Sequence, residues 1–122
     1  MKEKTNRFTI TPINPDLDFD FDRELSIGLS EKLGVPSIAI GLSQFDLGII
    51  CTLNKDGYVY SSDVNKKAIL SKYWDRNCEV IDDMFASACS VEELIETAIR
   101  VLNCFINDMD DNTLNYLQNK AA

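Results

Sequence analysis

The sequence contains no histidine, and this absence excludes more functions than any residue that is present. Serine-histidine-aspartate catalysis, cysteine-histidine catalysis and imidazole general-base chemistry all need this residue. Glycine-rich phosphate-binding loops are missing too, because neither G-x-x-x-x-G-K-[ST] nor G-x-G-x-x-G occurs. Paired carboxylates would still permit acid–base chemistry, but they need a sizeable cleft, which a chain this short rarely builds alone. We therefore expect a protein that is not an enzyme and uses no cofactor.

Long apolar stretches are absent as well, and none approaches the roughly 20 residues of a membrane span. The N-terminal residues MKEKTNRFTI are charged and no long apolar core follows them, so they do not read as a secretory signal. We expect a cytoplasmic protein without membrane contact. No linker rich in proline, glycine or serine divides the 122 residues, which predicts a single domain over residues 1–122.

Cysteine pairs at metal-binding spacing are also lacking. The four cysteines, Cys51, Cys78, Cys89 and Cys104, form no C-x-x-C pair, and each lies in an apolar stretch. A zinc site would need close-spaced ligand pairs, so we predict no metal site. Free cysteine is among the most buried residue types, and we expect these four to be reduced, buried and inert.

Positive charge is scarce, and the formal net charge is −8. Two acidic blocks, residues 16–53 and 77–119, flank a mildly basic centre at residues 54–76. Nucleic acid is an unsuitable partner for such a chain, because phosphate contacts need clustered lysine and arginine. The balance favours a basic protein partner or simple solubility.

What the sequence does have is an unusual acidic stretch, DLDFDFDRE, at residues 16–24. We call its five carboxylates the acidic row: Asp16, Asp18, Asp20, Asp22 and Glu24. In a β-strand they would face one side, and the apolar residues between them would face the other. One interpretation is an edge strand or lead-in whose charges block unwanted pairing. A second is a recognition surface for a basic partner, since opposite fields steer association.

A cation site is the third interpretation of the acidic row. The spacing D-x-D-x-D opens an EF-hand calcium loop, with Asp16 at its first position. The loop then needs glycine at the position of Phe21 and glutamate at the position of Ile27. Both requirements fail, so only a non-standard cation site remains open.

The order of elements predicts an α+β fold. Residues 7–12 favour a strand or extended arm, and residues 23–34 a short amphipathic helix with a leucine at every fourth position, ending at Gly34. Residues 35–42, 47–53 and 58–62 predict three antiparallel strands, with Asp56-Gly57 as a hairpin turn. Residues 64–76 fit an irregular helical turn or a further strand.

The clearest element is a long amphipathic helix over residues 90–108, opened by a capping box of Ser90 and Glu93. A short helix at residues 111–120 follows, with Leu114 and Leu117 facing the domain. Because helices and strands are segregated, we predict an antiparallel sheet of about four to five strands packed against the long C-terminal helix, with a short N-terminal helix.

Two further groups are candidates for partner contact. Tyr73 and Trp74 would suit an exposed anchor, because Trp, Tyr and Arg dominate interface hot spots, although the only Trp of a small domain is more often in the core. Asp82 and Asp83 are the second group of candidates. Their simpler interpretation, shared with the aspartates at residues 108–111, is a solvated face or a helix cap.

Residues 33–63, LGVPSIAIGLSQFDLGIICTLNKDGYVYSSD, with SVEELIETAIRVL at residues 90–102, resemble the SUKH superfamily. Its members share a segment ending in glycine, a strand, a D-x-G-x-V-Y hairpin and a closing helix. The matching pieces are Ile40-Gly41, Asp56-Gly57, Val59-Tyr60 and residues 90–98, and the resemblance spans about residues 25–103. It implies a bacterial immunity protein that neutralises a cognate toxin, often a nuclease. The hairpin motif is structural in this superfamily, so it implies no catalytic residue.

These observations predict an acidic binding protein, and most specifically an immunity protein that occludes the active site of a basic toxin domain. The expected contact residues are the acidic row, Tyr73, Trp74, Asp82 and Asp83. We expect a monomer or weak homodimer. The alternative is a small secretion chaperone that binds a segment of an effector protein, a class whose members are similarly acidic and usually dimeric.

Overall fold

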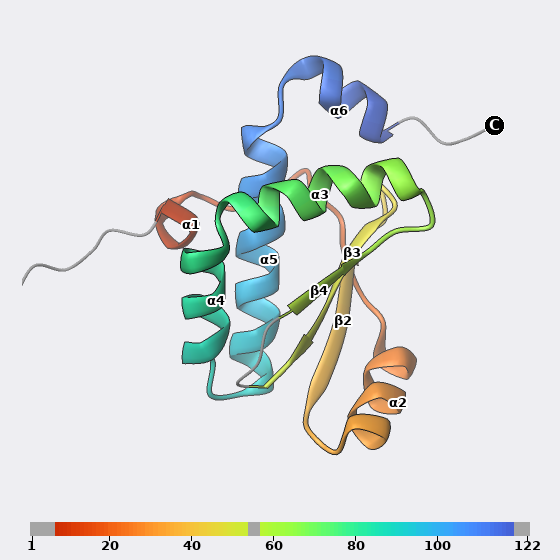
Figure 1. The fold of residues 1–122 in the computed structure, drawn as a ribbon, viewed down its shortest axis with the longest axis vertical. Helices are drawn as coiled ribbons and strands as arrows, with labels where there is room; N and C mark the ends of the chain where they lie inside the picture. Colours follow the sequence, from red (N-terminus) through yellow and green to blue (C-terminus); the bar gives the residue numbers. More distant parts are fainter. Residues whose placement is uncertain (1–6, 54–56, 119–122) are drawn as a thin grey trace, which may run out of the picture.

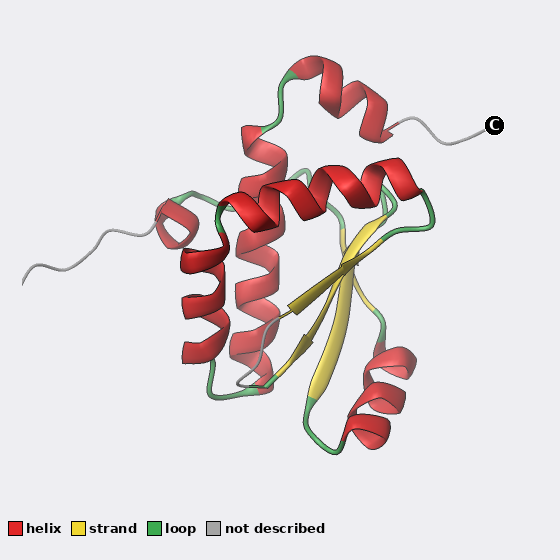
Figure 2. Cartoon of the chain, in the orientation of Figure 1, coloured by secondary structure: helices red, strands yellow, loops and turns green. Residues whose placement is uncertain are grey.

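The computed structural model describes residues 7–53 and 57–118 as a four-stranded antiparallel sheet with six helices (Figures 1 and 2). In chain order the elements are α1 (Arg7–Ile10), β1 (Phe19–Phe21), α2 (Arg23–Leu33), β2 (Ser37–Leu42), β3 (Leu47–Thr52), β4 (Gly57–Tyr60), α3 (Val64–Arg76), α4 (Cys78–Ser87), α5 (Val91–Asp108) and α6 (Asp111–Gln118). The predicted α+β class is confirmed, and so are the three predicted strands, as β2, β3 and β4. The predicted turn at Asp56-Gly57 lies partly outside the described residues.

The strands lie in the order β1-β2-β3-β4, and one face of the sheet builds the core. Directly paired residues share a face, so the register assigns Ile40, Ile49 and Val59 to one row. Ile38, Leu42, Leu47 and Cys51 belong to the same face and are buried. Helices α3 and α5 pack against this face (Figure 1). This hydrophobic face of the sheet is the surface that the predicted long helix packs against.

Helix α5 is stabilised by its apolar face and by its N-terminal cap. The Ser90 hydroxyl accepts a hydrogen bond from the Glu93 N–H at 3.2 Å. The Glu93 carboxylate in turn accepts from the N–H of Cys89 at 2.8 Å, one residue before the cap. Leu94, Leu102 and Phe105 are fully buried. The predicted capping box and long amphipathic helix are therefore confirmed. The predicted C-terminal helix is confirmed as α6, with Leu117 buried.

Residues 64–76 form a regular helix, which settles the open choice between helical turn and strand. The Asp63 carboxylate caps α3 by accepting from the N–H groups of Asn65 and Lys66, at 2.8 and 3.4 Å. Helix α4 follows and was not predicted from the sequence, and Asn77 at its start makes no side-chain cap. Trp74 of α3 stacks on Phe85 of α4 with 5.6 Å between ring centroids. This contact joins the two helices within the hydrophobic core.

The predicted strand or arm at residues 7–12 is wrong, because residues 7–10 form helix α1. Its Phe8 side chain is buried, and helix α5 holds the backbone around it. Arg100 donates to the carbonyl oxygen of Thr9 at 2.9 Å, and Asn103 donates to that of Pro12 at 3.0 Å. Tertiary contacts from one distant helix thus override the β-branched pattern of this segment.

Helix α2 lies along β2 and continues the edge that β1 begins (Figure 1). The Ser26 hydroxyl accepts from the Ala39 N–H at 2.9 Å and donates to the Asp22 carbonyl oxygen at 2.6 Å. One turn later, the Ser30 hydroxyl accepts from the Ser37 N–H at 2.8 Å. Two helix serines therefore satisfy backbone groups of β2 that a further strand would otherwise pair.

The predicted helix at residues 23–34 is confirmed, with Gly34 at a positive φ of 76° as its C-cap. An apolar stripe on a surface helix normally faces the core. Here Ser26 is the buried residue of α2, whereas Leu25 is 39% and Leu33 50% exposed. The leucine stripe of α2 is therefore available for something other than the core.

Replacing Ser26 with alanine should destabilise the fold by about 1–3 kcal/mol, because it leaves the buried N–H of Ala39 without a partner. Gly28→Ala on the same helix should instead raise stability by about 0.5–1 kcal/mol, since alanine is the better helix former. A Cβ at Gly28 would meet nothing within 4 Å. Urea unfolding of both variants measures the two effects, and equal midpoints would contradict the edge-sealing role of Ser26.

Candidate protein-binding surface

The acidic row leads from the turn before β1 into the first turn of α2. Asp16 and Asp18 precede the strand, Asp20 lies within it, and Asp22 and Glu24 belong to the start of the helix. All five side chains are exposed. Strand β1 lies at the edge of the sheet, as one interpretation predicted, but it is three residues long and so includes only Asp20 of the row.

Backbone contacts hold the acidic row in place while its first three carboxylates stay free. The Gln44 side chain donates to the Asp16 carbonyl oxygen at 3.0 Å and accepts from the Asp18 N–H at 2.7 Å. The Asp22 carboxylate is the N-cap of α2 and accepts from the Leu25 N–H at 3.0 Å. Within residues 7–53 and 57–118, the Asp16, Asp18 and Asp20 carboxylates make no hydrogen bond or ion pair.

The second face of the sheet differs sharply from the core face, and we call it the open face. Helix α2 flanks it on the β2 side. On the β4 side the Tyr58 side chain is 61% exposed and the Tyr60 side chain is half-buried. The floor of the open face consists mostly of small residues, of which Ser37, Ala39, Gly48 and Thr52 are buried. By register it comprises Asp20, Ser37, Ala39, Gly41, Gly48, Ile50, Thr52, Tyr58 and Tyr60.

Tyr60 lies across the glycines of the open face. A Cβ added to Gly48 would fall 2.4 Å from Cζ and 2.6 Å from the hydroxyl of Tyr60, so only glycine fits beneath the ring. A Cβ on Gly41, the next residue across the sheet, would lie 3.7 Å from the same hydroxyl. The Tyr60 phenol therefore extends over β3 toward β2 and toward Asp20, which pairs with Gly41 on the far side.

An acidic pocket of about 220 Å³ surrounds the Tyr60 phenol. Asp20, Asp22 and Asp46 supply its carboxylates, and they come from β1, the α2 cap and the β2–β3 turn. Partial burial raises the pKa of Tyr60 above its ordinary value of 10.0, and the three aspartates raise it further. Asp46 has a φ of 55° and accepts hydrogen bonds from the hydroxyls of Ser61 and Ser62. The pocket concentrates negative charge at one end of the open face.

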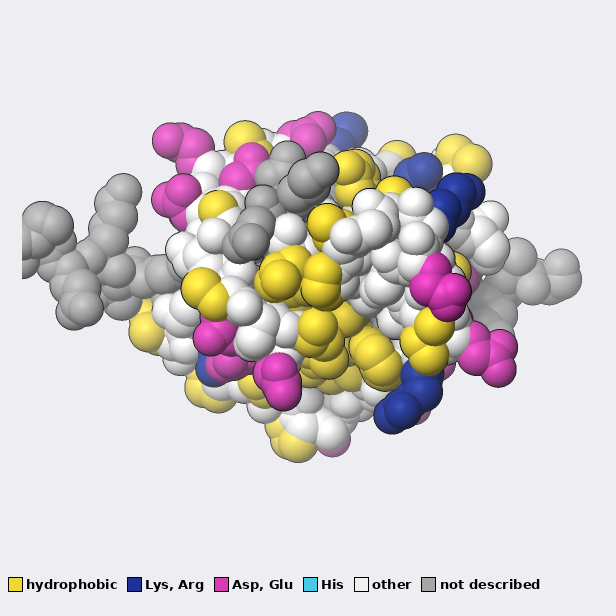
Figure 3. Space-filling model, turned by 90° about the horizontal axis from the view of Figure 1, so that it is seen from below, with side chains coloured by type: hydrophobic (Ala, Val, Ile, Leu, Met, Phe, Trp, Pro, Cys, Tyr) yellow, Lys and Arg dark blue, Asp and Glu magenta, His cyan; other side chains and the backbone are white. Residues whose placement is uncertain are grey.

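An apolar groove of about 430 Å³ lies at the other end of the open face. Part of the α2 leucine stripe forms one wall and Tyr58 the other; its lining is Leu29, Leu33, Val35, Ile50, Thr52 and Tyr58. Figure 3 looks at the lower end of the molecule, where hydrophobic side chains gather near the middle and charged ones lie toward the rim. The Thr52 hydroxyl is buried and has no hydrogen-bond partner among the described residues.

The other predicted contact residues do not belong to the open face, although Trp74 lines a small pocket together with Tyr58. Tyr73 and Trp74 are 6% and 9% exposed, so neither is an exposed anchor. The Tyr73 hydroxyl donates to the Asp108 carboxylate at 2.7 Å, and Arg7 pairs with that carboxylate from the other side. Asp82 is half-buried and Asp83 is exposed, both on α4.

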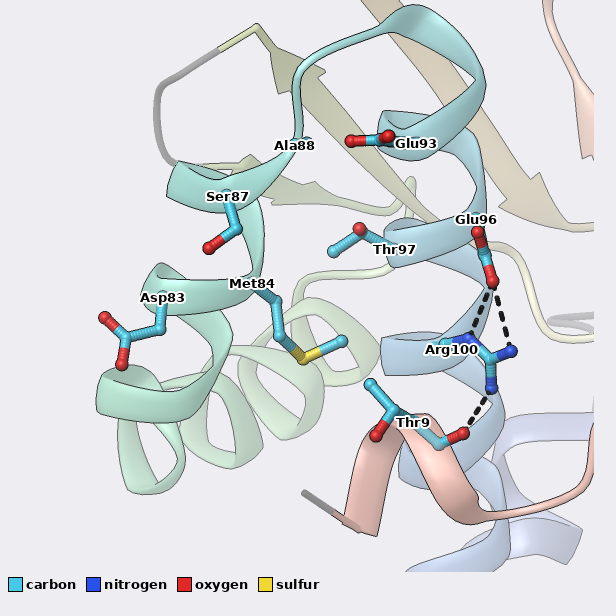
Figure 4. A pocket seen from close by; sticks show the side chains of 9 residues that line it. All are labelled: Thr9, Asp83, Met84, Ser87, Ala88, Glu93, Glu96, Thr97 and Arg100. Carbon is cyan, nitrogen blue, oxygen red and sulfur yellow. Dashed lines mark hydrogen bonds and ion pairs between the residues drawn. The ribbon is translucent and has the colours of Figure 1, made fainter. Parts of the chain in front are cut away.

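A separate cleft of about 330 Å³ lies between α1, α4 and α5, and Figure 4 shows its lining. Arg100 donates to Glu96 at 3.1 Å and to the Thr9 carbonyl oxygen, while Glu93 serves the α5 cap. Asp83 points away from the two glutamates (Figure 4). These groups join helices to one another, so we assign this cleft a structural role.

The prediction that all four cysteines are buried is correct for two of them and wrong for the other two. Cys51 and Cys104 are buried, but Cys78 and Cys89 are exposed, and all four are free. In the described part of the chain, no three residues of the types His, Cys, Asp and Glu are grouped to hold a metal ion.

Five residues of the open face and its acidic pocket were not predicted as site residues: Gly41, Asp46, Gly48, Thr52 and Tyr60. A signal for them exists in the period-two pattern of small residues at 37, 39 and 41, opposite two tyrosines on β4. A strand face of small residues leaves room for a side chain from elsewhere.

Comparison with protein-family models, curated proteins and solved structures finds no match for this chain. None of the described helices has the length and apolarity to cross a membrane. The surface of the chain itself is therefore the basis for assigning a function.

Proposed function

We propose that this protein binds a basic partner protein through the acidic row. In its most specific form the proposal is an immunity protein, which occludes the active site of a cognate toxin domain, in keeping with the resemblance to the SUKH superfamily. Occlusion needs no chemistry, only an interface of standard size, about 800 Å² per partner.

The observation that carries the proposal is the set of free carboxylates in the acidic row. Asp16, Asp18 and Asp20 are exposed and unpaired within the described residues, although the backbone of Asp16 and Asp18 is fixed by Gln44. Like charges held close together repel each other, and a basic partner relieves that repulsion. A fixed backbone also lowers the entropy that binding must remove from the free protein.

A secretion chaperone is the second candidate, and the exposed leucine stripe of α2 favours it. Leu25 and Leu33 form an apolar edge that would suit an amphipathic effector segment. Such chaperones are usually dimeric, so a sizing column would show a dimer before any partner is added. A monomer on that column favours the immunity protein.

Capture from a lysate of the native host should recover one stoichiometric basic protein at an ionic strength of about 0.05 M. The same capture should fail at about 0.5 M, where the Debye length falls to about 4 Å and exposed charges are screened. Recovery that is unaffected by salt would contradict an electrostatic interface.

A further inference from the structure

The acidic pocket and the apolar groove are two ends of one continuous surface. Tyr60 and Tyr58 are alternate residues of β4, and Gly48 and Ile50 face them from β3. Alternate residues of a strand are about 7 Å apart on the same face. An extended segment along the open face would therefore bring successive outward side chains first to one end and then to the other.

The acidic end is suited to a cationic side chain. Asp20, Asp22 and Asp46 surround the phenol of Tyr60, and among the described residues no lysine or arginine lines this pocket. An arginine or lysine there would meet carboxylates beside an aromatic ring, which are the two environments that attract these cations. Burial is the larger cause of the raised pKa of Tyr60, and the negative charge of the same three carboxylates raises this pKa further.

The apolar end is incomplete in the free protein. In its walls the Leu33 side chain is 50% exposed and the Tyr58 side chain is 61% exposed. The Thr52 hydroxyl at its floor is buried and has no hydrogen-bond partner among the described residues. Most buried polar side-chain atoms have a hydrogen-bond partner. An occupant with apolar side chains and a backbone amide or carbonyl would cover the leucines and satisfy the threonine.

We propose that the open face receives an extended segment of the partner, with an arginine or lysine in the acidic pocket and apolar side chains two and four positions away in the groove. This inference rests on the proposed function, because it assumes a basic protein partner. A second copy of this chain is a poor occupant, since it carries the same net charge of −8 and would be repelled by the carboxylates of the acidic pocket.

A synthetic heptapeptide, acetyl-Gly-Arg-Thr-Leu-Thr-Leu-Gly-amide, tests the inference directly by NMR titration of the ¹⁵N-labelled protein. We expect saturable shifts of amides in β3 and β4 at peptide concentrations of about 1 mM, as for a weak complex. Matched peptides with glutamate in place of arginine, or serine in place of both leucines, should bind at least fivefold more weakly. No saturation by about 5 mM, or shifts confined to α4 and α5, would overturn the inference.

Paired variants of the protein distinguish peptide binding in the groove from nonspecific binding to exposed apolar side chains. Leu33→Ser should weaken peptide binding at least fivefold, whereas Ile27→Ser should leave it unchanged. Both residues are about half exposed on the same helix, but only Leu33 lines the groove. Thr52→Val should raise the urea midpoint of the free protein, because it removes an unpartnered buried hydroxyl, and should weaken peptide binding. Equal losses for Leu33→Ser and Ile27→Ser would also overturn the inference.

The two proposals can fail separately. If the wild-type protein captures no basic partner, the proposed function fails. If it captures one, and Leu33→Ser and Thr52→Val capture it equally well, only the role of the open face fails.

Discussion

Replacing both Asp18 and Asp20 with lysine should weaken the affinity for the basic partner by at least about a hundredfold at low ionic strength. Close charge pairs across interfaces contribute about 1.5–7 kcal/mol each, and a hundredfold loss corresponds to only about 2.7 kcal/mol. Reversal turns two attractions into repulsions, so the loss should exceed that of simple truncation. Titration calorimetry with the purified partner measures it.

The fold should survive this double substitution, because neither carboxylate takes part in a hydrogen bond or ion pair within the described residues. Asp22 is left intact because it caps α2. The matched control is Glu31→Lys with Asp75→Lys, which also changes the net charge from −8 to −4. Both of these residues are exposed near helix C-termini, where lysine is favourable. An equal loss in the control would mean that net charge, rather than the acidic row, determines affinity.

Alkaline pH should destabilise the protein steeply, beginning near pH 9. Burial raises the pKa of the Cys51 thiol far above its ordinary value of 9.0, so the folded protein keeps a proton that the unfolded chain loses. The stabilisation is fully present below pH 9 and declines above it, by about 1.4 kcal/mol per pH unit for one such thiol. Between pH 9 and pH 11 the free energy of unfolding should thus fall by about 2.3 kcal/mol from Cys51 alone. Cys104 and Tyr73 add to the decline, because burial raises the pKa of each.

Two cysteine variants isolate this effect. Cys51→Ala should lower stability at neutral pH but flatten its decline above pH 9, because the ionisable group is gone. Cys78→Ala should keep the wild-type slope, since Cys78 is exposed on α4. Urea unfolding at a series of pH values gives both slopes, and an unchanged slope in Cys51→Ala would contradict burial of an intact thiol.

The elements that local chemistry specifies could be predicted from the sequence. Helix α5 carries its own capping box in Ser90 and Glu93 and a strong helical apolar period. The strands β2, β3 and β4 carry β-branched runs separated by turn residues, and Gly34 ends α2. In each case the signal lies within a few residues of the element, so no knowledge of the tertiary contacts was needed.

The features that depend on distant contacts could not be predicted. Phe8 becomes helical because Arg100 and Asn103, more than 90 residues away, hold the backbone that follows it. The leucine stripe of α2 stays outside because its serines, not its leucines, complete the edge of β2.

The same limit applies to the candidate site. The acidic row was visible in the sequence, but the open face beside it results from strand register. The register places Asp20, Gly41, Gly48 and Tyr60 in one row across four strands. A slip of one residue in any pair would place these side chains on the core face.

Amide hydrogen exchange of the captured complex tests the central claim most directly. Binding through the acidic row should slow exchange in residues 16–24, and an extended segment on the open face should slow it in β3 and β4. The amides of α4 and of the first half of α5 should exchange as in the free protein. Protection confined to α4 and α5, with residues 16–24 unchanged, would contradict the account.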